Sequence, residues 1–182
     1  TLARADLSKV SAMIRSIGFH NQKGNAIIAT AQRLISAFKG QVPSTREELL
    51  TFPGVGRKIA NVILSHGYQT PAIPVDTHVK RLTARLGLTK STSPPRIEKD
   101  LEDLLPKELW IAFSNLLIQH GRAVCTARRP RCASCLLRAR CPQVGVNTNA
   151  SQQGKNNGHL VDSGVSRALV SPAGSHPPPP RR

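Results

Sequence analysis

The sequence predicts an all-α protein, and three observations support this class. Apolar residues recur at helical spacing through residues 1–142, helix-capping residues and prolines stand where these segments begin, and no alternating apolar–polar run indicates a strand. Lys and Arg number 26 against 10 Asp and Glu, and the net charge of +16 favours an anionic partner over an acidic, disordered protein. No apolar run approaches the roughly 18 residues of a membrane span, so no membrane partner is expected.

Each predicted helix has a signal at its start or its end. Asp6 opens a helix that reaches Ile17 and is stopped by Gly18, and Asn21 and Gly40 bound the next helix. Thr45 with Glu48 opens a short helix that Pro53 ends. Later helices start after Gly56, at Asp76 and at Ser93 with Pro94, and Gly121 ends the last one. In the helix that Asp76 opens, Val79, Leu82 and Leu86 are expected to face inward and Lys80, Arg81 and Arg85 outward.

The composition changes near Pro142. Residues 143–182 are rich in Asn, Gln, Gly, Ser and Pro, and we expect them to form a disordered tail. The tail carries four basic and one acidic side chain, so +13 of the net charge lies in residues 1–142. The chain starts at Thr1 without an initiator Met, and we expect it to be N-terminally truncated.

A glycine-flanked turn between two helices is the first candidate site. Gly54 and Gly56 on either side of Val55 permit positive φ and leave backbone N–H groups uncovered at a helix start, where a DNA phosphate could bind. In the alternative interpretation, the two glycines only permit the tight connection between the helices and bind no phosphate. Lys58 lies in the first helical turn after Arg57, where the helix dipole and the neighbouring cation favour a neutral, nucleophilic amine; a plain phosphate-binding lysine is the alternative.

Asp76 is the second candidate, within Pro74–His78. An aspartate in this position usually caps the helix that follows, and capping alone is one reading. In the other reading, Asp76 lies across a cleft from Lys58 and assists its deprotonation or stabilises positive charge on a reacting sugar.

Four cysteines form a compact C-x6-C-x2-C-x5-C loop, which favours a structural metal site over disulfides in a reducing compartment. They are Cys125, Cys132, Cys135 and Cys141. Thiolate ligands alone do not separate zinc from an iron–sulfur cluster. Six arginines and no acidic residue lie between Gly121 and Cys141, so the loop is a cationic surface suited to DNA phosphates.

Three motifs in order resemble the endonuclease III family, the helix–hairpin–helix branch of DNA glycosylases. They are LTFPGVGRKIA at residues 50–60, VDTHV at residues 75–79, and the four-cysteine loop. The resemblance covers residues 1–142. It implies a partial helical barrel with the hairpin in residues 1–70, and a second helical domain with a 4Fe–4S cluster loop in residues 71–142.

The resemblance also implies roles for individual residues. Lys58 and Asp76 match the catalytic pair, and the four cysteines match the cluster ligands. The expected DNA contacts are Gly54, Val55, Gly56, Arg57, Arg128 and Arg129. The implied function is base excision repair: Lys58 attacks C1′ of a flipped-out, oxidised pyrimidine nucleotide, a Schiff base forms, and β-elimination cleaves on the 3′ side.

Two other functions stay open from the sequence. One is a non-catalytic DNA-binding module, and the other is an adenine or mismatch glycosylase without lyase activity, a branch that lacks an equivalent of Lys58. In the main interpretation a monomer binds double-stranded DNA with a damaged base or an abasic site. It would lie in the cytoplasm with the nucleoid in a prokaryote, or in the nucleus or mitochondrion of a eukaryote.

Family members carry further helices before the position of Thr1. Without them, apolar helix faces of the barrel would be exposed, so we expect this chain to be less stable and less active than an N-terminally extended one.

Overall fold

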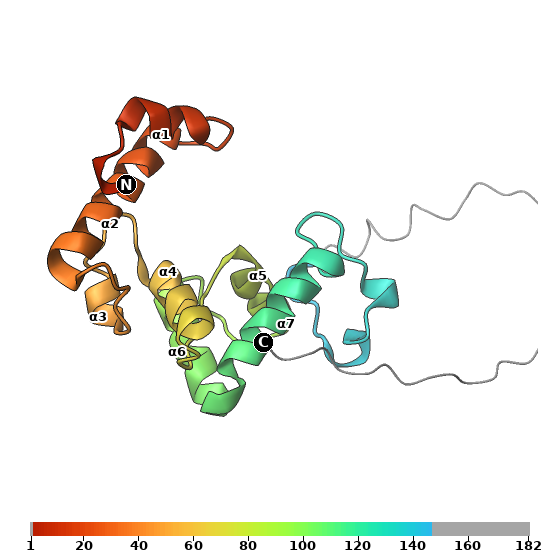
Figure 1. Cartoon of the computed structure of the whole chain (residues 1–182). Helices are drawn as coiled ribbons and strands as arrows, with labels where there is room; N and C mark the ends of the chain where they lie inside the picture. Colours follow the sequence, from red (N-terminus) through yellow and green to blue (C-terminus); the bar gives the residue numbers. More distant parts are fainter. Residues whose placement is uncertain (1, 147–182) are drawn as a thin grey trace, which may run out of the picture.

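The computed structural model describes residues 2–146, which are helical and contain no strand, so the predicted all-α class is confirmed (Figure 1). The α-helices are α1 (Leu7–Met13), α2 (His20–Phe38), α3 (Arg46–Leu49), α4 (Arg57–Val62), α5 (Thr77–Arg85), α6 (Pro94–Leu104) and α7 (Trp110–Ala123). Single turns are η1 (Leu2–Arg4), the π-helical η2 (Ile63–Gly67), η3 (Lys107–Leu109), η4 (Cys132–Ser134) and η5 (Arg138–Arg140). The predicted disordered tail lies mainly outside the described residues.

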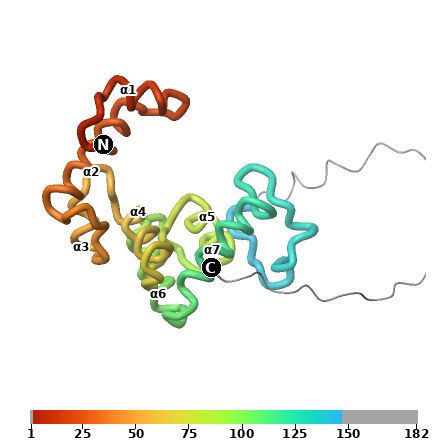
Figure 2. Tube along the Cα trace, viewed as in Figure 1, coloured from red at the N-terminus to blue at the C-terminus, as the bar shows by residue number. Residues whose placement is uncertain are grey.

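The chain runs from one end of an elongated molecule to the other, as the colour order of the trace shows (Figure 2). α1 packs against α2 at one end, and α4 and α6 lie in the middle. α5 packs against α7, and the cysteine loop follows α7 at the far end. No helix in residues 2–146 is long and apolar enough to cross a membrane.

Several predicted helix starts are confirmed. The Asp6 carboxylate accepts two backbone N–H groups of the first turn of α1, and the Thr45 hydroxyl accepts the N–H of Glu48 in α3. Pro94 is the first residue of α6, where its missing N–H costs nothing. Local capping chemistry is therefore readable from the sequence.

One predicted helix end and one predicted helix start near the N-terminus are wrong. α1 ends at Met13 and not at Ile17. Asn21 is not a cap, because α2 begins one residue before it and follows Phe19, which has a φ of 60°. The Asn21 side chain instead accepts a hydrogen bond from the Ser11 hydroxyl of α1. A contact between two helices thus uses a side chain that local sequence assigns to a helix start.

Two apolar clusters hold the helices together. The larger joins α5, α6, α7 and the segment before α5 through Ile73, Val75, Val79, Leu82, Ile97, Leu101 and Leu117. The smaller joins α3, α4, η2 and the segment after η2 through Leu49, Ala60, Leu64 and Ala72. α4, the helix that follows the hairpin, is therefore packed through the smaller cluster in the middle of the molecule.

Apolar side chains of α2 lie outside both clusters. Ile27 is 36% exposed and Ile35 is 58% exposed. An open apolar groove lies between α2 and the hairpin, with Leu34, Pro53 and Ile59 among its lining residues. Exposed apolar helix faces are what the sequence predicts for this end of the molecule.

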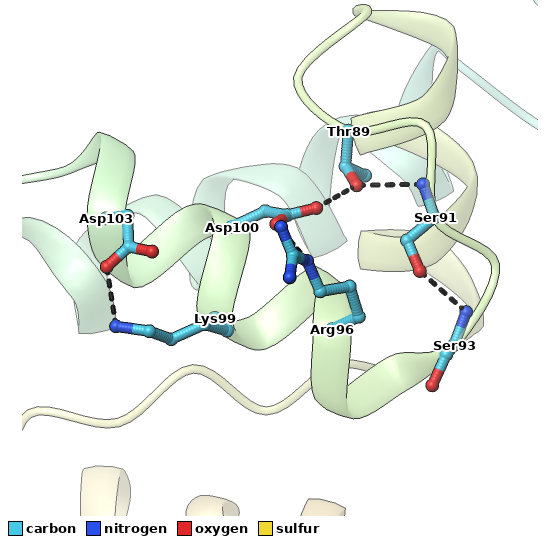
Figure 3. A network of polar contacts seen from close by, with 7 residues as sticks. All are labelled: Thr89, Ser91, Ser93, Arg96, Lys99, Asp100 and Asp103. Carbon is cyan, nitrogen blue, oxygen red and sulfur yellow. Dashed lines mark hydrogen bonds and ion pairs between the residues drawn. The ribbon is translucent and has the colours of Figure 1, made fainter.

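A polar network surrounds the first turns of α6 (Figure 3). Thr89 Oγ1 donates to Asp100 Oδ2 at 2.5 Å, and Arg96 Nε donates to Asp100 Oδ1 at 2.7 Å. The Thr89 hydroxyl is the main cause that holds the pKa of Asp100 below its usual value, and Arg96 contributes further. Lys99 and Asp103 pair one turn later, at 2.6 Å.

Leu101→Ala is expected to lower the free energy of unfolding by about 2–5 kcal/mol, because it leaves a cavity in the larger cluster. Leu104→Ala on the same helix is the matched control, since Leu104 is 54% exposed and its loss should matter by about 0.5 kcal/mol or less. Urea unfolding followed by circular dichroism measures both. Equal losses in the two variants would contradict the packing described.

Thr89→Val is expected to raise the pKa of Asp100, because the main hydrogen bond to its ionised form is lost. A lowered carboxyl pKa stabilises the fold above the unfolded-state pKa, and this contribution is lost as the pH falls through the folded-state pKa. The variant should therefore lose more stability at neutral pH than in acid. NMR titration of Asp100 and unfolding at several pH values test this, with the exposed Thr92→Val as control.

Candidate active site

The loop between α3 and α4 forms the tight hairpin that the sequence predicts. Val55 N–H donates to the Phe52 carbonyl at 3.1 Å, and the Phe52 side chain is buried. Gly54 has a φ of 77°, which favours glycine, whereas Gly56 has a φ of −93°, so the expectation of positive φ holds for Gly54 alone. Within residues 2–146 no side chain caps α4, and its first backbone N–H groups stay available to an anion.

The start of the hairpin is packed against the end of α2. The rings of Phe38 and Phe52 lie 5.2 Å apart, and the Arg33 guanidinium lies 5.6 Å from the Phe52 ring. Arg33 Nε also donates to Thr51 Oγ1 at 3.0 Å. These contacts fix the entry to the hairpin.

Glu98 on α6 binds both helices that flank the hairpin, although its carboxylate is only 2% exposed. Arg57 donates from Nε to Oε2 at 2.6 Å and from Nη2 to Oε1 at 3.1 Å. Arg46 Nη2 lies 3.2 Å from Oε1. The Glu98 carboxylate raises the pKa of Arg57 above its already high value. Two nitrogens of Arg57 are thus engaged within the protein, and its contact with DNA stays a prediction.

Lys58 is exposed in the first turn of α4. Three residues later, Asn61 is fully buried and donates from Nδ2 to the Ile73 carbonyl at 2.9 Å. Ile73 precedes Asp76 by three residues, so this bond ties the helix of Lys58 to the segment that leads into α5. The joint action of Lys58 and Asp76 stays a prediction.

Asp76 is the N-cap of α5, as the sequence predicts. Its Oδ1 atom accepts the backbone N–H groups of His78 and Val79, both at 2.8 Å. Both bonds end on one oxygen, so capping uses only half of the carboxylate. The side chain is half-buried, which keeps it within reach of a ligand.

The four cysteines line one apolar cavity beside the end of α5, and no disulfide joins them. Arg85 Nη1 donates to Cys125 Sγ at 3.3 Å, and His120 Nε2 lies 3.4 Å from Cys135 Sγ. Burial raises the pKa of Cys132, and repulsion from the other three thiolates raises it further. In residues 2–146, no three His, Cys, Asp or Glu side chains meet closely enough to hold a single metal ion. Four thiols around one apolar cavity are a donor set that fits an iron–sulfur cluster.

Arg81 and Arg85 bind the cysteine loop, so the prediction that they face outward is wrong. Arg81 Nη2 donates to the carbonyls of Gly121 and Cys125, both at 3.0 Å. Arg85 Nη1 donates to the Thr126 carbonyl at 2.7 Å. Carbonyls at and after a helix end have no partner within the helix, and these guanidinium groups supply it. The helical period places Arg81 and Arg85 on a polar face but cannot show that the loop covers this face.

Gly121 permits the close approach of α5 and α7, and it is not the helix end that the sequence predicts, since α7 continues to Ala123. A Cβ atom at Gly121 would lie 2.9 Å from His78 Nδ1 and 3.0 Å from Arg81 Nη2. The first distance is shorter than real Cβ contacts and the second is tight, so a larger residue at this position would force the His78 and Arg81 side chains to shift.

The arginines of the cysteine loop are exposed, as expected for a cationic surface. They are Arg128, Arg129, Arg131, Arg138 and Arg140, and the exposed Arg122 lies just before them in the last turn of α7. Their side chains are accessible to phosphates, although the Arg131 guanidinium also donates to the Ala123 carbonyl. The proposed DNA contacts of Arg128 and Arg129 stay predictions.

Reasoning from the sequence missed Glu98 and Asn61. A signal for each exists: Glu98 lies beside Ile97 and three residues before Leu101, on the inward face of α6, and Asn61 follows the buried Ala60. A polar residue on an apolar face requires a buried partner. Its partner cannot be named from the sequence, because it comes from another helix.

Comparison with known proteins gives relatives along most of the described residues. Endonuclease III of Synechocystis is 49% identical over 144 residues, which cover 79% of this chain and 66% of the relative. Endonuclease III of Thermotoga maritima is 39% identical over 140 residues, with 77% and 66% covered. The chain thus spans just under two thirds of the length of these relatives.

Solved structures give the same fold. A trapped endonuclease III–DNA covalent intermediate matches with a TM-score of 0.75 at 40% identity, covering 78% of this chain and 67% of that one. A thermostable thymine-DNA glycosylase matches with a TM-score of 0.68 at 22% identity, which supports the fold alone. The family model of the HhH-GPD superfamily base excision DNA repair proteins matches residues 1–107. The chain belongs to the HhH-GPD superfamily of base excision DNA repair proteins.

Proposed function

We propose that this chain is a DNA glycosylase with abasic-site lyase activity, acting on oxidised pyrimidines in double-stranded DNA. The observation that carries the proposal is the exposed Lys58 at the start of a helix whose first N–H groups are uncapped, directly after a glycine hairpin. The bond from Asn61 to Ile73 connects this helix to the segment that ends in Asp76. A relative at 40% identity is described as a trapped covalent intermediate with DNA, which supports a covalent mechanism here.

In the proposed reaction, the neutral Nζ of Lys58 attacks C1′ of the flipped-out nucleotide and the C1′–N bond to the damaged base breaks. The departing base takes up a proton. The Lys58 nitrogen, now an ammonium, loses one proton, and its electron pair then breaks the C1′–O4′ bond, so that O4′ takes up a proton and a protonated Schiff base forms between Nζ and C1′. Removal of a C2′ proton forms a double bond between C2′ and C3′, the bond between C3′ and its oxygen breaks, and the 3′ phosphate leaves. Water then hydrolyses the Schiff base and frees Lys58. The Asp76 oxygen not needed for capping would receive the proton from Lys58 and stabilise positive charge on the sugar.

The same proposal assigns the surface that binds DNA. The backbone around Gly54, Val55 and Gly56 would hold a phosphate near the lesion, and the exposed side of Arg57 would contact the next one. Arg128 and Arg129 would grip the backbone from the cysteine loop. We further propose that the protein acts as a monomer on a damaged base or an abasic site, in the cell compartment that contains this DNA.

The four cysteines would hold a 4Fe–4S cluster in the cavity that they line. When bound, such a cluster cross-links the loop through four Fe–S bonds and leaves no ligand position open for chemistry. Arg81 and Arg85 hold the loop carbonyls and one sulfur from α5, so the chain itself contributes to keeping the ligands in place.

Lys58→Gln is expected to abolish the covalent adduct that borohydride traps between the protein and duplex DNA with an abasic site, because no amine remains to form the Schiff base. Lys107→Gln, which removes an exposed lysine in η3, is the matched control and should keep the adduct. Denaturing gel electrophoresis measures both. DNA binding by the unaltered chain without any adduct would support a non-catalytic module or a glycosylase without lyase activity.

Cys132→Ser is expected to lower the content of iron and acid-labile sulfide per chain and to reduce the visible absorbance of the purified protein, because one of four cluster ligands is replaced. Ser134→Ala, within the same loop, should leave both contents unchanged. Colourless, unaltered protein with stoichiometric zinc would disprove the cluster assignment.

A further inference from the structure

We propose that Glu98 is a positioning residue for Lys58: from its buried place on α6, its carboxylate fixes both flanks of the hairpin and thereby the orientation of the lysine amine. The inference rests on the proposed function and adds to it a residue that does not contact DNA. Neither the hairpin motif nor the catalytic pair contains Glu98.

The first argument is geometric. α3 ends just before the hairpin and α4 begins just after it. One carboxylate binds Arg46 at the start of α3 and Arg57 at the start of α4, with nitrogen–oxygen distances from 2.6 to 3.2 Å. The two flanks are thus attached to the same point of α6, and they cannot separate without breaking these contacts.

The second argument is the charge balance. Glu98 is 2% exposed, whereas the side chains of Arg46 and Arg57 are 26% and 45% exposed. A buried carboxylate is tolerated because it is paired and hydrogen-bonded. Without this charge, two guanidinium groups would face each other across the site with no anion between them. Their repulsion would push the flanks of the hairpin apart.

The third argument concerns transmission to the lysine. Arg57 and Lys58 are consecutive residues in the first turn of α4, so a shift of the Arg57 backbone moves Lys58 with it. Ile97 and Leu101, on either side of Glu98 in α6, are fully buried in the larger cluster and hold this helix still. Misplacement of a reacting group by about 1 Å can lower a rate on the order of 100-fold.

Glu98→Gln tests the proposal, because it keeps the shape and an acceptor oxygen but removes the charge. Asp103→Asn is the matched control: the same carboxylate-to-amide change on α6, at an exposed ion pair with Lys99. Trapping by borohydride at saturating abasic-site duplex should be at least tenfold slower with Glu98→Gln. The Kd for a duplex with an uncleavable tetrahydrofuran site should change by less than threefold, and Asp103→Asn should change either value by less than twofold.

A second variant separates positioning from a general loss of structure. Adding Arg46→Gln to Glu98→Gln removes one of the two facing cations, and Arg46 has no part in the proposed DNA contacts, so trapping should recover by at least threefold over Glu98→Gln alone. General unfolding would not be reversed by a second substitution. Failure of this recovery, or trapping by Glu98→Gln at the rate of the unaltered chain, would overturn the proposal.

Hydrogen exchange gives a readout that does not depend on catalysis. The hydrogen-bonded amides of Val55, Ile59 and Ala60, in and directly after the hairpin, should exchange faster in Glu98→Gln, while those of α7 keep their protection. Unchanged exchange at these three amides, or equally faster exchange throughout, overturns the proposal. An unaltered chain that forms no adduct would overturn the proposed function and the link to Lys58, while locally faster exchange would still show that Glu98 holds the hairpin.

Discussion

The arrangement of the candidate site depends on compensating one buried negative charge. The ionised Glu98 carboxylate lies within the protein, where an unpaired charge costs several kcal/mol. Two arginines from separate helices form ion pairs with it and so compensate its charge. Satisfying this constraint brings α3, α4 and α6 to one point and closes the hairpin between them. The hairpin geometry therefore depends on a residue that lies 40 positions after Lys58 in the chain.

α5 connects the two chemical centres of the molecule. Its first residue follows Asp76, the predicted partner of Lys58, and its last turns carry the arginines that bind the cysteine loop. Several cations counted in the net charge of +16 are consequently engaged inside the protein. The proposed DNA-binding surface is therefore smaller than the net charge alone would predict, and it comprises the hairpin, Lys58 and two exposed arginines of the loop, Arg128 and Arg129.

Much of the fold follows from local sequence, because helix starts are decided within one turn. Asp6, Thr45 and Asp76 cap the helices that they precede, and Pro94 opens α6. The errors arise where a contact from elsewhere overrides a local signal. Asn21 bonds to α1 and caps nothing, and Gly121 marks a close approach of α5 and not the end of α7.

The sequence by itself determined the all-α class, the glycine hairpin before Lys58, the capping role of Asp76 and the grouping of four cysteines, because each depends on residues near one another in the chain. Only the tertiary structure decided which partners satisfy Glu98, Asn61, Arg81 and Arg85. Their partners lie between 12 and 52 positions away, and periodicity shows which face of a helix is polar but not which element covers it. These long-range polar contacts position the hairpin with Lys58, the segment that leads to Asp76 and the cysteine loop, which the sequence identifies as candidate sites without placing them in space.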